Sequence, residues 1–250
     1  MLVTRVFSTS VLIQHNSLAL RSQQLSQIGN HAIGVLMSTM EEIKEGRGHL
    51  FRPPRSARAR VVLNWTGEPD EKFEFYGESF LQAAIRLEQA YDGDGPHRDF
   101  AACPIVFLLR HALELYLKGF ILAGDDLLAL NGEIRVDRNK VLQSHALLPL
   151  LAEADKVTDA LGWDWEMGDK APQSREEFAA LLAEFDCVDR KAYAFRYPTD
   201  PKGAPALPSP FDFDLSVLLE KIMPVCKALD SSITGAQVAV HNEREMREYT

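Results

Sequence analysis

The sequence has few of the residues and motifs that mark several common classes of protein. Only three of its 250 residues are cysteines, and they are widely spaced with no CxxC pair, which argues against a disulfide framework or a cysteine-based zinc site. The seven histidines show neither HxxxH nor HExxH spacing. The sequence contains no GxSxG, GxGxxG or P-loop motif. We therefore expect no cofactor and no metal ion.

Long apolar runs are also missing. A membrane-spanning helix needs about 20 consecutive apolar residues, and the longest candidate, within 103–124, is interrupted by Arg110, Glu114 and Lys118. The net charge of −9 disfavours broad electrostatic binding to nucleic acid or anionic membrane, although an acidic chain can still contain a local basic groove. These features predict a cytoplasmic protein without membrane contact.

Acidic residues are absent from the first forty positions, which contain Arg5 and Arg21 among many Ser and Gln. This composition is typical of a mitochondrial transit peptide, although two arginines are few for such a signal. The alternative is a start codon assigned too early, with Met37 or Met40 as the true start. Both interpretations make residues 1–39 a non-globular extension outside the fold.

The next segment, residues 40–70, reads as a linker. It contains the basic, proline-containing stretch GRGHLFRPPRSARAR at 46–60 and the apolar piece VVLNW at 61–65, a candidate short strand. A basic stretch of this kind is either a solvated connection or a contact for phosphate, and the acidic remainder of the chain favours the solvated connection.

From residue 71 to 250 the apolar spacing is helical, and we expect one helical domain. Apolar residues recur three and four positions apart within 71–91. Ser174 and Glu177 form a capping box, and Ser144 is a natural N-cap. Pro104 fits only the first turn of the helix expected over 99–123. The fold class is all-α, an antiparallel bundle of four to five helices with long irregular connectors.

One expected helix, 103–122, is apolar around most of its circumference yet contains four ionisable residues. Arg110, Glu114 and Lys118 fall at i, i+4 and i+8 and share a face, and His111 borders the apolar side. Two interpretations stay open. The three charges form weak ion pairs at the surface, or they form a partly buried network in which Arg110 and Glu114 are a bidentate pair and His111 is a base or a donor.

Three segments in series resemble HEPN-like helical bundle proteins, in particular a bacterial branch. They are RHALELYLK at 110–118, SHALLPLL at 144–151 and FRYP at 195–198, and the resemblance covers roughly residues 70 to 230. It implies a bundle of four to five helices that is often dimeric. Many HEPN proteins are metal-independent ribonucleases in toxin–antitoxin, phage-defence or RNA-processing systems, whereas others bind nucleotides or protein partners without catalysis.

HEPN nucleases use an arginine and a histidine with four to six residues between them, usually with a polar residue after the arginine. The stretch RNKVLQSH matches this pattern with Arg138, Asn139 and His145. The place of this stretch in the chain differs from the family's pattern. Arg138 lies in a connector, whereas the arginine–histidine pair of the nucleases lies late in the bundle. By this resemblance, Arg138 and His145 are candidate catalytic residues.

The corresponding chemistry is general acid–base catalysis. His145 would take the proton from a ribose 2′-OH, while Arg138, Arg110 or Arg196 would hold the phosphate. His111 is a second candidate base. The structural alternative places His145 at a helix N-terminus.

Further side chains are candidates for substrate binding, namely Glu114, Lys118, Arg196 and Tyr197. The aromatic residues of FRYP would stack on a base. The structural alternative is that Arg196 reaches a helix C-terminus or Glu114. We interpret the acidic pairs Asp125–Asp126 and Asp186/Asp189 as solvated helix ends.

Three functions stay open. The first is a HEPN-like protein that acts on or binds RNA or a nucleotide in a stress or defence system, with its arginines and histidines converging in a cleft. The second is a non-catalytic HEPN-like module that forms a homodimer or binds an antitoxin or other neighbour-encoded partner, with those residues scattered or used in internal ion pairs. The third is an unrelated helical enzyme for small phosphorylated substrates, which requires a deep enclosed pocket.

Overall fold

The chain divides into two compact units, residues 1–65 and 66–250. The computed structural model describes residues 33–45, 72–91, 93–95, 98–207 and 212–248, together with positions 47, 50, 56, 58, 60 and 61. In the first unit residues 33–44 are helical, so the last part of the predicted extension is a helix. Residues 1–32 and most of the predicted linker, including 62–65 of the candidate strand, lie outside the described residues.

The second unit is helical, as predicted. Its elements are α2 (Phe73–Gln89), α3 (Arg98–Ala129), α4 (Arg138–Gln143), α5 (Leu147–Leu161), α6 (Arg175–Asp189) and α7 (Leu215–Glu248). Within the described ranges there is no strand, and the isolated β-bridge joins Thr199 to Pro205. The all-α class is therefore confirmed.

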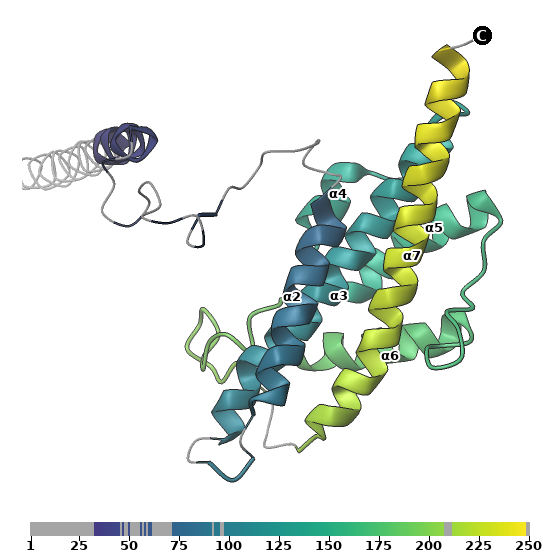
Figure 1. The fold of residues 1–250 in the computed structure, drawn as a ribbon. Helices are drawn as coiled ribbons and strands as arrows, with labels where there is room; N and C mark the ends of the chain where they lie inside the picture. Colours follow the sequence, from purple (N-terminus) through teal and green to yellow (C-terminus); the bar gives the residue numbers. More distant parts are fainter. Residues whose placement is uncertain are drawn as a thin grey trace, which may run out of the picture. The chain divides into compact units, whose positions relative to one another are not determined.

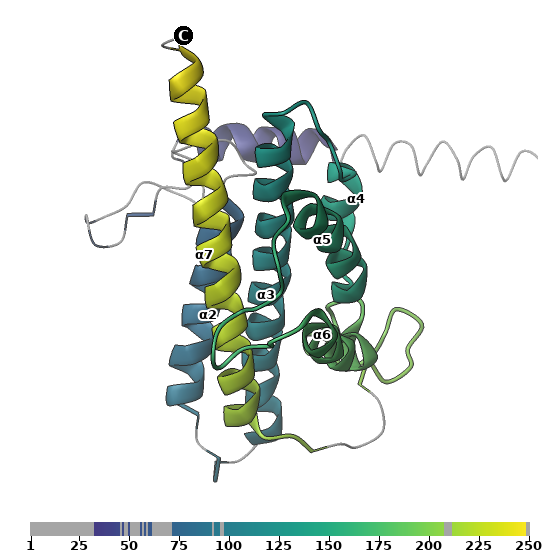
Figure 2. The same ribbon diagram turned by 90° about the vertical axis from the view of Figure 1, so that its right-hand side faces the viewer.

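Helix α3 is the central element of this unit. It packs against α2 and α7 on one side and against α5 on the other, and α6 packs against α5. Figures 1 and 2 show α2, α3 and α7 running alongside one another. In Figure 2, α6 is seen nearly end-on, so it lies across these three helices.

The central position of α3 follows from its composition. A helix that is apolar on nearly all sides can be stable only where it is surrounded by other elements. Between positions 105 and 125 the side chains are buried except for a narrow, partly open stripe formed by Phe107, Leu108, His111 and Leu115. Pro104 is the seventh residue of α3 and not a first-turn residue, because the helix begins six residues earlier.

Helix α3 also passes a simple test for membrane spans. Among the described residues it is the one helix long and apolar enough to cross a membrane by length and composition, and 61% of its most apolar window is buried inside the fold. A mostly buried core helix passes the same test, so this is weak evidence for a membrane span.

The contact between α3 and α5 requires a residue without a side chain at one point. A Cβ atom at Gly124 would overlap Cγ1 of Val157 on α5. Because Val is stiff at χ1, it cannot move aside without strain. The two helices can therefore approach this closely only with glycine at position 124.

We predict that Gly124→Ala lowers the free energy of unfolding by about 1–3 kcal/mol, the usual effect of overpacking a core. Urea denaturation measures it. Gly235→Ala on α7 is the matched control, because a Cβ there meets no atom within 4 Å. This control should leave stability unchanged or raise it by about 0.5–1 kcal/mol, since alanine is the better helix former. Equal effects of the two substitutions would contradict this account of the helix contact.

Candidate functional site

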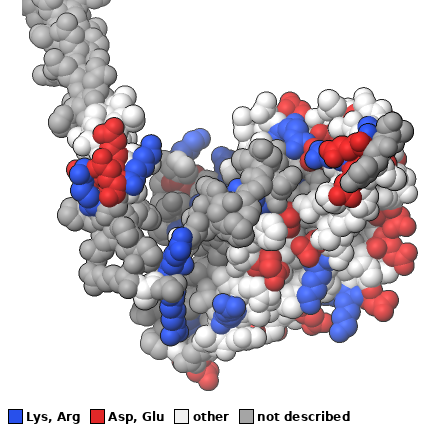
Figure 3. Space-filling view, turned by 45° about the horizontal axis from the view of Figure 1, so that its top comes forward, with Lys and Arg blue, Asp and Glu red and all other residues white. Residues whose placement is uncertain are grey.

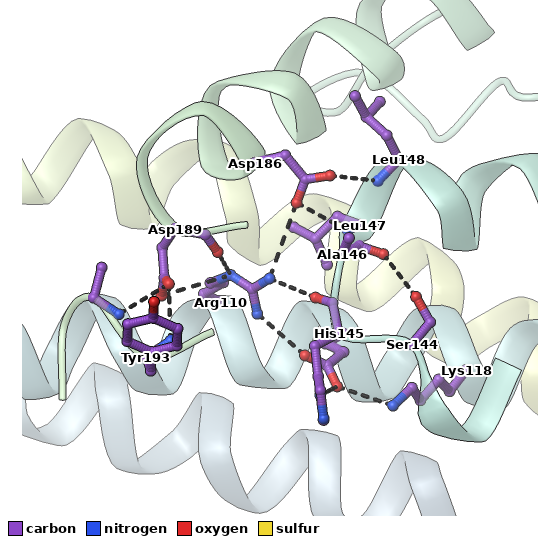
Figure 4. A network of polar contacts seen from close by, with 12 residues as sticks. Arg110, Lys118, Ser144, His145, Ala146, Leu147, Leu148, Asp186, Asp189 and Tyr193 are labelled. Atoms are coloured by element: carbon purple, nitrogen blue, oxygen red, sulfur yellow. Dashed lines mark hydrogen bonds and ion pairs between the residues drawn. The ribbon is translucent and has the colours of Figure 1, made fainter. Parts of the chain in front are cut away.

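The charged face of α3 is buried. Arg110 is 0%, Glu114 1% and Lys118 4% exposed. The interpretation as surface ion pairs is therefore wrong, and the three residues belong to an internal polar network (Figure 4). The network is closed by α6, α4 and the turn between α4 and α5.

Arg110 joins three parts of the chain. Its Nε donates to the backbone oxygen of Asp189 over 3.0 Å, its Nη2 to the backbone oxygen of His145 over 2.5 Å, and its Nη1 to Glu114 Oε2 over 3.1 Å. The predicted bidentate pair with Glu114 is not formed, because two of the three guanidinium nitrogens bind backbone carbonyls. Arg110 thus fixes the end of α6 and the α4–α5 turn to α3.

Glu114 receives three donors within the fold. Its Oε2 accepts from Arg110, and its Oε1 lies 2.9 Å from Lys118 Nζ and 3.0 Å from His145 Nδ1. Lys118 Nζ also donates to the backbone oxygen of Leu142 over 3.1 Å. Burial alone raises the pKa of a carboxyl group, but the charge and hydrogen bond of Lys118, the hydrogen bond of His145 and the charge of Arg110 outweigh it, so the pKa of Glu114 is lowered.

The ionised Glu114 determines the tautomer of His145. A carboxylate only accepts hydrogen bonds, so His145 Nδ1 must be the donor. In the neutral ring the lone pair then lies on Nε2. The His145 side chain is 61% exposed, and no described residue hydrogen-bonds its Nε2. The arrangement is a buried carboxylate, an oriented imidazole and a free basic nitrogen at the surface.

Two aspartates of α6 complete the network, and the interpretation of both as solvated helix ends is wrong. The Asp186 side chain is 6% exposed and accepts from the backbone N–H groups of Leu147 and Leu148, each over 2.9 Å. It thereby caps α5, whereas the predicted N-cap, Ser144, is the C-cap of α4. The Asp189 residue is 3% exposed, and its Oδ1 accepts from the N–H groups of Tyr193 and Ala194.

Both carboxylates lie near the Arg110 guanidinium. Asp186 Oδ1 is 4.0 Å from Nη2, and Asp189 Oδ2 is 3.9 Å from Nε. Asp189 Oδ2 is buried without a hydrogen bond. Since these distances are long for hydrogen bonds, the attraction is mainly Coulombic. The network thus gathers carboxylates of α3 and α6 around one buried cation.

His111 lies outside this network. Its ring packs edge-on against Phe80, with centroids 4.5 Å apart, and is stacked on Phe107 at 5.6 Å. Burial lowers the pKa of His111, and nearby cationic side chains lower it further against the opposing effect of Glu114. The ring is therefore neutral near pH 7, and its surroundings are those of a packed aromatic side chain.

Arg196 and Tyr197 lie at the exposed end of the same aromatic cluster. The guanidinium carbon of Arg196 is 5.1 Å from the centroid of Phe107 and 5.6 Å from that of Tyr197. These are cation–π contacts, and they take the place of the predicted contact with Glu114 or a helix C-terminus. Because both side chains are exposed, another flat group has access to them.

Arg138 contacts another part of α3. Its Nη1 donates to Asp126 Oδ1 over 2.9 Å and to Asp125 Oδ2 over 3.4 Å. Asp125 is buried at 2%, so the predicted solvated pair Asp125–Asp126 is instead a partner for this arginine. These two contacts of Arg138 run to the end of α3 and not to the Glu114–His145 pair.

In the described part of the helical unit that Figure 3 shows, Lys and Arg side chains lie among Asp and Glu side chains. Among the described residues, no three His, Cys, Asp or Glu side chains are grouped to hold a metal ion. No family model, curated protein or solved structure matches the chain. What is shown is an all-α protein with a buried ionic network beneath an exposed histidine.

We predict that Arg110→Met lowers the free energy of unfolding by about 3–5 kcal/mol, because it leaves buried carboxylates and two backbone carbonyls without their partner. Chemical denaturation measures the change. Arg175→Met is the matched control, since Arg175 forms an exposed ion pair with Asp155 at 2.7 Å. This control should lose no more than about 1 kcal/mol. Similar small losses for both variants would show that the network contributes little to stability.

Proposed function

We propose that this chain is a HEPN-like helical protein that acts on or binds RNA or a nucleotide, with His145 as its general base. The observation that supports this most directly is the 3.0 Å contact between Glu114 Oε1 and His145 Nδ1. A carboxylate on one imidazole nitrogen, with the other nitrogen exposed, is the arrangement that a general base requires. The proposal includes a four- to five-helix bundle that forms a homodimer in the cytoplasm.

The burial of the network assigns the roles within this proposal. Arg110, Glu114 and Lys118 are too buried to touch a substrate, so they are positioning residues that hold His145. Arg196 and Tyr197 are exposed and are the groups we assign to phosphate and base. Phe107, beneath Arg196, precedes Glu114 by seven residues on α3, about 10 Å along the helix. Arg196 and His145 are thus held by positions about 10 Å apart along α3, a separation that suits a chain of nucleotides better than one small molecule.

The proposed reaction is cleavage of RNA by its own 2′-hydroxyl. His145 Nε2 takes the 2′-OH proton, the 2′ oxygen attacks the adjacent phosphorus, and the bond to the 5′ oxygen breaks. The products are a 2′,3′-cyclic phosphate and a 5′-OH end, which takes up a proton. Arg196 offsets the charge that grows on the phosphate oxygens. This route needs no metal ion, and it would suit a toxin or defence ribonuclease.

A second candidate is a non-catalytic HEPN-like module that dimerises or binds a neighbour-encoded partner such as an antitoxin. The observation that favours it is that Arg110 and Lys118 bind backbone and carboxylate groups within the fold, so their charges are not available to a ligand. In a non-catalytic module of this kind the network stabilises the α4–α5 turn, and His145 takes part in no reaction.

The test is RNA cleavage by the full chain in the presence of EDTA. We expect the wild-type protein to produce 2′,3′-cyclic phosphate ends, and His145→Ala to reduce the rate by about 10²–10⁴-fold, the usual contribution of a general base. His241→Ala is the matched control, because His241 is an exposed histidine on α7 with one carboxylate contact. His111→Phe should also keep activity, since His111 packs between aromatic rings.

Full activity in His145→Ala would overturn the assignment of the base. Loss of activity in His111→Phe with a folded protein would move that assignment to His111. Failure of the folded wild-type protein to cleave several RNAs, together with no RNA binding, would leave the interaction module as the supported function.

A further inference from the structure

A hollow in the helical unit lies apart from His145, beneath the connector between α5 and α6. Its volume is about 560 Å³, and its walls come from three places: Phe120 of α3, residues 162–167 of the connector, and Leu229 with its neighbours on α7. Figure 2 shows this connector running from α5 across the face of α3 toward α7 and back to α6. None of the residues assigned above to RNA lines this hollow.

Aromatic rings form much of the wall. Phe120 lies 5.8 Å from Trp163 and 5.9 Å from Trp165 between ring centroids, and Trp165 lies 5.5 Å from Phe178 in the core. These contacts hold both indoles in place while each stays only partly buried. Within the described part of the chain, neither indole N–H has a hydrogen-bond partner, although tryptophan N–H groups usually find one when buried.

The local sequence explains why two carboxylate side chains, those of Asp164 and Glu166, lie at the edge of the hollow. In the run WDWEM, positions 163, 165 and 167 are partly buried and positions 164 and 166 are exposed, the alternation of an extended chain. Asp164 and Glu166 both line the hollow, and among the residues that the structure describes no lysine or arginine does so. The hollow therefore combines two indole rings with two negative charges.

We propose that this hollow binds a compact organic cation, of the quaternary or alkylated ammonium class. Such a cation is attracted to the face of an indole ring, and tryptophan is the best of the aromatic residues for this contact. The two carboxylates add Coulombic attraction and repel phosphate-bearing ligands. This site does not rest on the function proposed for His145, because its walls and its charge are different.

The test uses the full chain and two ligands of the same shape. Choline is the cationic probe, and 3,3-dimethyl-1-butanol, in which carbon replaces the quaternary nitrogen, is its neutral counterpart. Titration calorimetry at constant ionic strength should show that choline binds at least about fivefold more tightly, the ratio that ~1 kcal/mol of cation–π energy gives.

Two variants separate the contributions of charge and ring. The double variant Asp164→Asn, Glu166→Gln removes the charges and keeps the shape of both side chains. Asp164 Oδ1 accepts from the backbone N–H of Glu166 over 3.1 Å, and the amide oxygen of the variant can accept the same hydrogen bond. This double variant should weaken choline binding by about fivefold, the ratio that ~1 kcal/mol of Coulombic attraction at an exposed site gives. Trp163→Leu, checked for folding by circular dichroism, should weaken it by at least as much.

Asp169→Asn is the matched control, since Asp169 is an exposed acid in the same connector that does not line the hollow. It should leave choline binding unchanged. Equal binding of the two ligands would overturn the proposal, as would no saturable binding of choline at high millimolar concentration. Binding that the double variant and Trp163→Leu both leave unchanged would place the cation elsewhere.

Discussion

The buried carboxylate of Glu114 is the group on which the arrangement of this protein depends. Moving a charge from water into a protein interior costs several kcal/mol even after relaxation, so it persists only with partners. Glu114 has three, Arg110, Lys118 and His145, and two of them also bind backbone carbonyls of other segments. Through these contacts one carboxylate on α3 positions α4, the α4–α5 turn and the end of α6.

The same network separates the residues that hold the site from those that meet solvent. Arg110 and Lys118 are enclosed, whereas His145, Arg196 and Tyr197 are at the surface. A buried ion cluster of this kind is weak evidence for stability on its own, because replacing all of its members together by well-packed apolar residues often serves equally well, whereas removing one member leaves the others unpaired. In the proposed chemistry the network serves to orient His145, whose Nδ1 lies 3.0 Å from Glu114 Oε1.

The sequence was sufficient to predict the helices with clear apolar periodicity, the cap at Ser174 and the common face of Arg110, Glu114 and Lys118. It was not sufficient to predict what covers that face. The partners are backbone carbonyls of a short helix, of the α4–α5 turn and of the last residue of α6, and a carboxylate, Asp186, that caps a helix from 39 positions away. Side-chain periodicity does not report on backbone carbonyls. Side-chain spacing reports on one helix, whereas burial depends on the elements that pack against it.

The central claim is that Glu114 fixes His145 with its proton on Nδ1 and its lone pair on Nε2. The direct measurement is a long-range ¹⁵N–¹H correlation spectrum of the full chain labelled with ¹⁵N-histidine, recorded at a pH where the ring is neutral, with His145→Ala for assignment. The account predicts the Nδ1–H tautomer for His145 in the wild-type protein and a mixture of tautomers in Glu114→Ala. A predominant Nε2–H tautomer in the wild-type protein would contradict it.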